Sequence, residues 1–385
     1  MMKHYRRFLL LLSMLSAATF ANAQIKVDAS EMVELMAILS RTAGFREYCM
    51  DMGGQYTKDT EVWFAPYKQH PAIACMKDLR SKYNIGYDAV MTMAINLETD
   101  GKKVTMTGEK LNLGNRWQNI EIDTFLVHLN HFYADTRFHD FYTQHQSFYE
   151  SVLRTYEQNV MQYFHQDWYP RFYGTEPTER FRVVIGFTNG GGNYGPSRQL
   201  PSHSKEVFAI CGYSIDEKTG KAFENGTDYA ATLIHEFNHS FVNPLYDAHS
   251  DILESVGQKL FRMSYRSMSQ QAYKNVSTVI NESVVRAAVI IYMQDNGFTP
   301  AQIETQLSEQ IDRGFLWMPE LVGSMSKYSK HRNRYNTLGE YYPEIVKCLN
   351  KYATKEKKRQ EKSLRKLKNM RELKQIHTMF KDLLE

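Results

Sequence analysis

The sequence predicts a predominantly helical α+β fold, on three observations. Residues 24 to about 170 carry their apolar side chains mainly at helical spacing. Two segments rich in β-branched and apolar residues, 181–187 and 207–214, are typical of strands in a small sheet. Helical spacing then resumes near Thr227 or Asp228, so we expect a long helix directly after this sheet.

The chain is long enough to need more than one domain. Its 385 residues are 43% hydrophobic and 13% aromatic, which excludes disordered and fibrous proteins. Pro170 and the stretch 174–177 break the helical pattern and mark a boundary. We therefore expect a mainly helical N-terminal lobe over 24–175, a core over 176–345 in which the sheet precedes the long helix, and a C-terminal helix over 346–385.

The first 23 residues have the features of a secretory signal peptide. Lys3, Arg6 and Arg7 precede an apolar stretch over 8–20, and Ala-Asn-Ala at 21–23 is a small-residue cleavage site. The apolar stretch is too short to span a bilayer, and no later run is long enough. The sequence thus predicts an exported protein, periplasmic or secreted, without a transmembrane anchor after cleavage.

Local signals place the remaining elements. Ser30 is placed to cap a helix that runs through Leu39, and the apolar face of this helix comprises Met32, Leu35, Met36 and Leu39. A hairpin over 89–97 and 103–107 is expected around the Asp100-Gly101 turn. Helical periodicity predicts further helices at 122–132, 138–164, 277–294, 300–313 and 343–352.

Charge is unevenly distributed along the chain. From Lys351 to Glu385 there are 12 Lys/Arg and 5 Asp/Glu, so this tail carries +7 although the whole chain carries only +4. Apolar residues recur within the tail at steps of three and four: Leu364, Leu367, Met370, Leu373, Ile376, Phe380 and Leu383. Such a tail can bind nucleic acid or anionic lipid, but we favour a surface helix that docks through this stripe, and no nucleic-acid partner is expected for an exported protein.

The four cysteines give no metal or redox motif. Cys49, Cys75, Cys211 and Cys348 are widely scattered and contain no C-x-x-C spacing. Disulfides and free thiols both remain open, and the sequence does not determine the connectivity.

The strongest functional signal is His235-Glu236-Phe237-Asn238-His239. On a helix, two histidines four residues apart project from one face and can hold one metal ion, while Glu236 lies beside them as a general base. Zinc lowers the pKa of its bound water to about 7, and a neighbouring carboxylate can take the proton as the water attacks a carbonyl. The expected helix is apolar around these polar residues, and we expect Pro244 to end it.

A catalytic zinc ion needs a third protein ligand. The extended H-E-x-x-H-x-x-G-x-x-H pattern fails, because Val242 stands at its Gly position and Leu245 at its last His position. The nearby donors are Asp247, His249, Asp251 and Glu254.

A more distant candidate for the third ligand is Glu282, inside the next strongly apolar helix. An acid in such a helix needs a partner, which is either a metal ion or Arg286 four residues on. We favour ligation, because Arg286 can also orient the ligating carboxylate.

These residues carry a resemblance to known families. A His-Glu-x-x-His helix followed by Asn281-Glu282 in a second helix resembles the gluzincin zinc metallopeptidases. Most of the chain, from about 32 to 345, also resembles the DUF4932 family of exported Bacteroidetes proteins. The segments that carry this second resemblance are MVELMAILSRTAGFREY, HPAIACMKDLRSKYNIGYDAVM, FLVHLNHFYADTRFHDFY, GGGNYG, HEFNHSFVNP, NESVVRAAVIIY and GFLWMPELVGSMSKY.

The gluzincin resemblance implies a zincin-like core, one Zn²⁺ per chain and specific roles. His235, His239 and Glu282 would be the ligands, Glu236 the general base, and a peptide or protein the substrate. The resemblance also implies that the strand before the active-site helix pairs with extended substrate, which places Phe187, Asn189, Gly191, Asn193 and Tyr194 along the cleft. The 43-residue step from His239 to Glu282 is longer than in compact members.

The sequence therefore predicts an exported zinc metallohydrolase, specifically a peptidase. The rival hypothesis is an envelope protein that binds a peptide or glycan on a zincin-like fold without cleaving it. A third is a structural protein whose histidines only pack. The donor for the oxyanion is left unassigned among Tyr292, Tyr328, Tyr335, His331 and Arg286, and the oligomeric state is undetermined.

Overall fold

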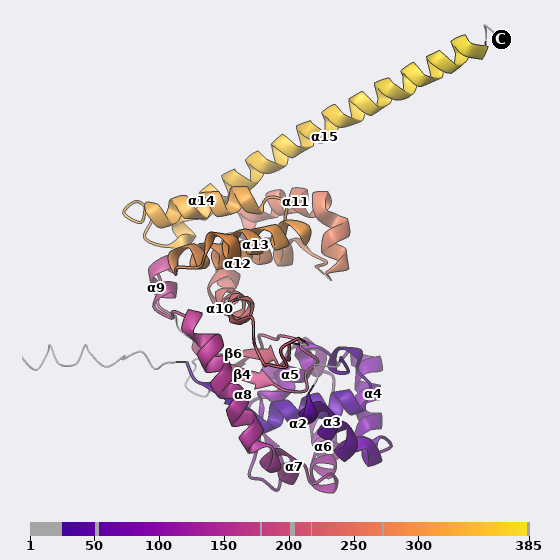
Figure 1. The fold of residues 1–385 in the computed structure, drawn as a ribbon, viewed down its shortest axis with the longest axis vertical. Helices are drawn as coiled ribbons and strands as arrows, with labels where there is room; N and C mark the ends of the chain where they lie inside the picture. Colours follow the sequence, from indigo (N-terminus) through magenta and orange to yellow (C-terminus); the bar gives the residue numbers. More distant parts are fainter. Residues whose placement is uncertain are drawn as a thin grey trace, which may run out of the picture. The chain divides into compact units, whose positions relative to one another are not determined.

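The computed structural model describes residues 25–50, 54–177, 179–200, 205–216, 218–271 and 273–382. The expected signal peptide lies outside these residues. The described chain is mostly helical, with a small mixed sheet and a separate hairpin, so the predicted predominantly helical α+β class is confirmed (Figure 1).

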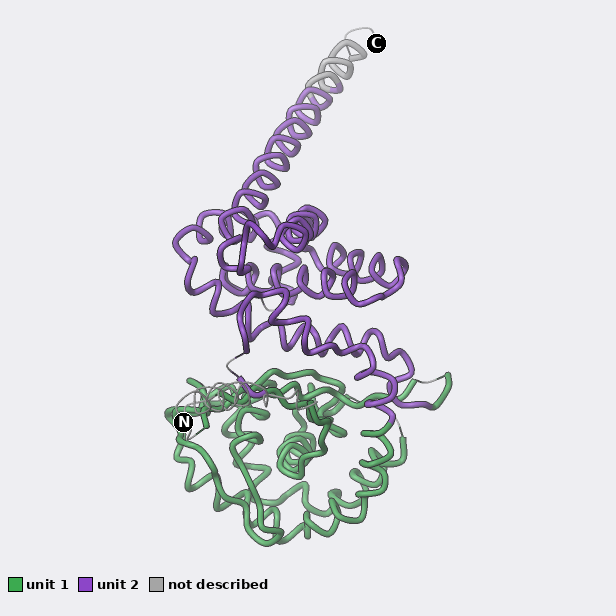
Figure 2. The backbone as a smooth tube through the Cα atoms, turned by 90° about the vertical axis from the view of Figure 1, so that its left-hand side faces the viewer, with its two compact units in different colours: residues 1–154, 181–220 green, residues 155–180, 221–385 purple. Residues whose placement is uncertain are grey.

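The chain divides into two compact units (Figure 2). Unit 1 comprises residues 1–154 and 181–220, and unit 2 comprises 155–180 and 221–385. The helices that lie largely in unit 1 are α2 (Glu31–Thr42), α3 (Gln55–Phe64), α4 (Pro71–Tyr83), α5 (Asp88–Ala94), α6 (Ile122–Asp135), α7 (Phe138–Gln144) and α8 (Gln146–Asn159). Those of unit 2 are α9 (Trp168–Tyr173), α10 (Gly226–Ala248), α11 (Ser250–Gln270), α12 (Val276–Asp295), α13 (Pro300–Asp312), α14 (Met318–Lys330) and α15 (Leu338–Asp382). Short 3₁₀ turns occupy Arg46–Tyr48, Ala65–Tyr67, Lys110–Leu113, Asn115–Trp117 and Met161–Tyr163.

Helix α2 forms as its sequence predicts. The Ser30 hydroxyl accepts a hydrogen bond from the Val33 amide at 3.3 Å, which satisfies one of the free amides of the first turn. The expected apolar face, Met32, Leu35, Met36 and Leu39, is buried. Glu34 is buried as well, although it is an acid.

The four-stranded sheet has the order β1-β4-β6-β5, with β1 (Val27–Ala29), β4 (Arg180–Gly186), β6 (Lys205–Gly212) and β5 (Ser197–Gln199). Strand β1 runs parallel to β4 with Val27 opposite Val183, and β5 runs antiparallel to β6. This pairing joins β4 and β6 to the N-terminal segment. The two units therefore do not follow the boundary that we expected near residue 176, and the sheet groups with the N-terminal helices.

The expected hairpin is present but shorter than predicted. Strands β2 (Leu97–Thr99) and β3 (Val104–Met106) pair around the Asp100-Gly101 turn. Residues 89–94, which we expected to extend the first strand, instead belong to helix α5. A short apolar run is compatible with a strand or a buried helix, and packing on α2 selects the helix here.

Helix α12 is the core of unit 2. It packs against α10, α11, α13 and α14, and most of its residues are buried. By length and composition α12 could cross a membrane, so the expectation that no run after the signal peptide is long enough is wrong for this helix. However, 78% of its most apolar window is buried inside the structure. It is thus explained as a core helix.

Helix α10 differs from prediction at its end. Pro244 lies inside the helix, which continues to Ala248, so the expectation that Pro244 ends the helix is wrong. The helix tolerates a proline without a backbone N–H because the surrounding packing holds the last turn, where Tyr246 is buried.

Helix α15 joins the predicted helix 343–352 and the predicted tail helix 346–385 into one helix that begins at Leu338. Its buried face ends at Ala353, and beyond it Leu364, Leu367 and Met370 are 65%, 52% and 53% exposed. The expectation that the tail docks through this stripe is therefore wrong for these three residues. The side chains of Leu373, Ile376, Phe380 and Leu383 lie outside the described part.

All four cysteines are free thiols.

Candidate metal centre

Two packed helices of unit 2 supply the predicted ligands. His235 and His239 lie one turn apart on α10, and Glu282 lies in the second turn of α12, the helix that packs against it. An apolar body surrounds them, because Leu233, Ile234, Val279 and Ile280 are fully buried. The polar side chains are thereby held in an otherwise apolar helix interface.

The three donor groups converge at spacings that suit one metal ion. The Nε2 atoms of His235 and His239 lie 3.2 Å apart. The two oxygens of Glu282 face different histidines: Oε1 lies 3.4 Å from His239 Nε2 and Oε2 lies 3.6 Å from His235 Nε2. With one donor atom from each residue, all three atoms lie within 4.8 Å of one another. Zinc–ligand bonds of about 2.0–2.1 Å in a tetrahedron place two ligand atoms about 3.3–3.4 Å apart. The residues thus fit a zinc ion.

The two histidines of the cluster have opposite pKa shifts. Burial lowers the pKa of His235 below its usual value, so its imidazole is neutral, as a metal ligand must be. Burial is also the largest effect on His239 and lowers its pKa, but the hydrogen bond to Glu282, the charges of Glu282 and Glu236 and the hydrogen bond to Asn243 together leave the pKa raised, so a metal ion would have to displace a proton there. Burial raises the pKa of Glu282, yet the two histidines and Arg286 together hold it well below its usual range.

Arg286 pairs with Glu282, the candidate third ligand. Its Nε and Nη2 donate to Glu282 Oε2, at 3.0 and 2.8 Å. The guanidinium is itself fixed by Gln310 Oε1 at 2.8 Å and by the Tyr273 hydroxyl at 2.9 Å, and it lies over the ring of Phe315. Both interpretations of the sequence are therefore true of the geometry: Glu282 pairs with Arg286 and also faces the histidines.

Glu236 is half-buried next to the first ligand. Burial raises the pKa of its carboxyl, and the negative charge of Glu282 adds to that effect. A carboxyl with a raised pKa beside a metal site is suited to accept and return a proton near neutral pH.

Aromatic residues from α9 fix the orientation of α10. The Tyr173 hydroxyl donates to Asn238 Oδ1 at 2.8 Å, inside the His-Glu-x-x-His segment itself. The rings of Tyr169 and Tyr173 stack on Phe241, with centroids 5.5 and 4.5 Å away. Asn238 and Phe241 are both buried, so this packing fixes the helix that carries His235 and His239.

The other candidate ligands and oxyanion donors do not join this cluster. Asp247, His249, Asp251 and Glu254 lie at the end of α10 and the start of α11, and the metal-binding cluster does not include them. The hydroxyls of Tyr292 and Tyr328 donate to the carbonyls of Tyr163 and Phe172, while His331 contacts the Lys327 carbonyl. The oxyanion donor stays unassigned.

The predicted substrate-binding segment lies in unit 1. Phe187 and Asn189 are buried, and the Asn189 amide donates to the Gly192 carbonyl. Asn193 accepts from the Gly212 amide, and Tyr194 exchanges two backbone hydrogen bonds with Ile210. Gly191 has a positive φ of 71° and its backbone closely approaches that of Gly212. These contacts give the segment a structural role, and its role toward substrate stays a prediction.

Sequence reasoning missed Tyr273 and Gln310. Both contact Arg286 from elements outside α12, one from the loop before it and one from α13. Gln310 is buried within an otherwise exposed helix, which is unusual for a polar residue, but only the fold reveals its partner.

Comparisons with curated proteins and with solved structures give no match to this chain. Residues 24–348 match the family DUF4932, which is described as a domain of unknown function. The match includes the three candidate ligands and Glu236. Because it spans most of the sequence, the chain belongs to the DUF4932 family.

Proposed function

We propose that this protein is an exported zinc-dependent metallohydrolase that cleaves peptide bonds. The observation that carries the proposal is the donor set of His235, His239 and Glu282, with separations between 3.2 and 3.6 Å. Three protein ligands leave one position for water or substrate, which is typical of catalytic zinc, whereas structural zinc has four protein ligands.

A bound zinc ion would polarise a carbonyl and lower the pKa of a water molecule to about 7. Glu236 takes the proton of the attacking water. Its raised pKa lets the carboxyl hold that proton and then return it to the departing amine. Arg286 keeps Glu282 ionised and correctly oriented throughout.

We further propose that the metal-bearing helices are zincin-like. The pair α10 and α12 supplies all three ligands and the base, in the order of the gluzincin pattern. The likeness rests on this helix pair, because the strands β4 and β6 group with unit 1.

The first test is the metal content of the purified protein beside its His239→Ala variant. We expect about one zinc per chain in the wild type and little in the variant, since one ligand is lost. Zinc-free wild-type protein that is folded and has been supplied with zinc would contradict the metal site.

The second test separates catalysis from binding. Glu236→Gln should retain zinc but lose hydrolysis of an internally quenched peptide library by about 10²–10⁴-fold, the usual contribution of a general base. Glu304→Gln, an exposed carboxylate on α13, is the matched control and should keep full activity. If the wild type binds zinc and peptides but cleaves none of them, the protein is a binding protein.

Export has its own test. We propose that residues 1–23 are removed and that no transmembrane anchor remains. N-terminal sequencing of the protein from the periplasm or medium should begin at residue 24, and an intact N-terminus on a cytoplasmic protein would contradict export.

A further inference from the structure

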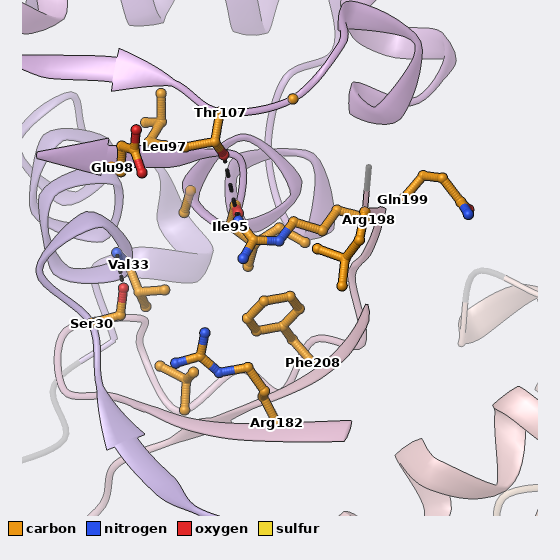
Figure 3. A pocket seen from close by; sticks show the side chains of 14 residues that line it. Ser30, Val33, Ile95, Leu97, Glu98, Thr107, Arg182, Arg198, Gln199 and Phe208 are labelled. Atoms are coloured by element: carbon orange, nitrogen blue, oxygen red, sulfur yellow. Dashed lines mark hydrogen bonds between the residues drawn. The ribbon is translucent and has the colours of Figure 1, made fainter. Parts of the chain in front are cut away.

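A cavity of about 440 Å³ lies within unit 1 and shares no residue with the candidate metal centre. Strands β4, β5 and β6 form one side, and the start of α2, the end of α5 and the hairpin β2–β3 form the other (Figure 3). The cavity is open to solvent, since the exposed residues Glu98 and Gln199 belong to its lining, so a small molecule could enter it. Its volume is within the range of small-molecule sites, about 300–1,000 Å³.

The walls of the cavity are largely apolar. The apolar lining residues are Val33, Ala94, Ile95, Leu97, Val184, Leu200 and Phe208. All of these except Leu200 are less than 9% exposed, so they belong to ordered packing. A ligand with an apolar body could pack against these side chains.

Two arginines flank Phe208 inside the cavity, and one of them is committed to the fold. Arg198 donates to Glu206 through Nε and Nη2, at 2.8 and 2.7 Å, and to the Ile95 carbonyl through Nη1 at 2.5 Å. Its guanidinium also lies over the Phe208 ring, 5.4 Å from the centroid. Arg198 therefore acts as part of the wall.

Arg182 is different, because most of its donors are available. Among the described residues it makes one hydrogen bond, from Nη2 to Asp28 at 3.2 Å, and Glu206 is 3.9 Å away. Its side chain is 41% exposed. Figure 3 shows its guanidinium reaching into the hollow from the side opposite Arg198, with Phe208 between them. Its remaining N–H groups can meet a ligand there.

The preference for an anion comes from Arg182 itself. Arg182 and Arg198 are linked through Asp28 and Glu206, so these two cations and two anions balance. Lys26, which pairs with Asp28, is 79% exposed and does not line the cavity, and Glu98 lines it but is exposed, so water screens both charges. The N–H groups of Arg182 that Asp28 leaves unpaired favour a charged acceptor such as a carboxylate.

We propose that this cavity binds a small molecule with an apolar body and one carboxylate. The carboxylate pairs with the free edge of Arg182, and the body packs against Phe208, Val184 and Leu97. The site is separate from the metal centre and does not depend on the proposed peptidase activity.

The test uses hexanoate, octanoate and 3-phenylpropionate as probes. The uncharged control is 3-phenylpropanamide, the amide of 3-phenylpropionate. Isothermal titration of the full protein should detect at least one carboxylate, and the amide should bind at least about 10-fold more weakly than its acid. The His239→Ala variant should bind the carboxylates unchanged, which excludes binding at the metal centre.

Variants then locate the site. Arg182→Gln should weaken carboxylate binding about 10-fold and leave amide binding unchanged, whereas Arg182→Lys should retain part of the preference. Arg154→Gln is the control, because Arg154 is exposed and pairs only weakly with Glu150 at 3.8 Å. Equal binding of acid and amide by the wild type would overturn the proposal even if Arg182→Gln failed to fold. Unchanged binding in a folded Arg182→Gln, or no binding of any carboxylate, would also overturn it.

Discussion

An α-helix in each unit contains a buried glutamate, and the carboxyls of these two residues have opposite pKa shifts. Glu34 on α2 is fully buried in unit 1, and Glu282 on α12 is 8% exposed in unit 2. Burial raises the pKa of Glu34 to about 7, whereas that of Glu282 is held well below its usual range. Burial alone therefore does not determine whether the pKa of a buried glutamate is raised or lowered.

The partners make the difference. Glu34 accepts only neutral donors, namely the Phe187 amide at 2.7 Å and the hydroxyls of Thr188 and Tyr56 at 2.9 Å. These bonds lower its pKa only in part. Glu282 instead faces the guanidinium of Arg286 and two imidazoles. The neutral donors of Phe187 and Thr188 join the segment after β4 to helix α2 through Glu34. The cationic Arg286 instead keeps Glu282 negatively charged, as a metal ligand must be.

The largest effect is expected from neutralising Glu282. Glu282→Gln should lower zinc affinity more than about 100-fold, because a ligand is lost and second-shell changes alone cost 10–100-fold. Competition with a chromogenic zinc chelator measures this. Glu34→Gln is the matched control and should leave zinc affinity unchanged; equal losses in both variants would show that the contrast between the two carboxyls is false.

The next effect is the pH dependence created by Glu34. Its folded pKa of about 7 exceeds the usual 4.5, so the folded state binds the proton more tightly and loses stability as pH rises between these values. The expected loss is about 3 kcal/mol between pH 4.5 and pH 8.

Urea unfolding at pH 5 and pH 8 tests this dependence. The fall in unfolding free energy seen for the wild type should be largely absent in Glu34→Gln. Glu121→Gln, an exposed carboxyl, is the control and should keep the wild-type slope. A slope that survives in Glu34→Gln would assign the dependence to another group.

A third test asks whether Arg286 supports zinc binding through its hydrogen bonds to Glu282 or only through its charge. Arg286→Gln should weaken zinc binding about 10–100-fold, because Glu282 loses its orienting hydrogen bonds. Arg313→Gln removes an exposed charge that also acts on His235 and should change affinity far less. Similar losses in both variants would mean that overall charge, and not the hydrogen bonds, controls the site.

The smallest effect concerns one neutral donor. Tyr56→Phe keeps the ring but removes the hydroxyl that bonds Glu34, which should cost about 1 kcal/mol at pH 8. The cost should be smaller at pH 5, where Glu34 is protonated. Urea unfolding at both values would detect this difference, and an equal cost at both would contradict the stated role of the bond.

The cluster of His235, His239 and Glu282 could be predicted because its signals are local. His235 and His239 are four residues apart, and Glu282 is an acid within an apolar helical segment. The same signal exists at Glu34, which lies inside the apolar stretch MVELMAIL, so the burial of Glu34 could also have been predicted from the sequence.

What the sequence did not predict depends on contacts between distant segments. Strand β1 pairs with β4 more than 150 residues later, and this pairing assigns the sheet to unit 1. Pro244 would end an isolated helix, but tertiary packing carries α10 past it. Tyr273 and Gln310 meet Arg286 only once α12 and α13 are assembled.

Unit 2 is discontinuous, since the insertion 181–220 separates α9 from the helices that bear the ligands. A gene fragment that begins at residue 221 would encode every ligand, yet it would lack the partner of Asn238 and the rings that stack on Phe241. Trp168, which bonds Asp295 at 2.9 Å, would be missing as well. If the proposed zinc site exists, truncation maps will therefore overestimate its minimal region, and changes in residues 168–173 will mimic mutations of the candidate ligands without altering them.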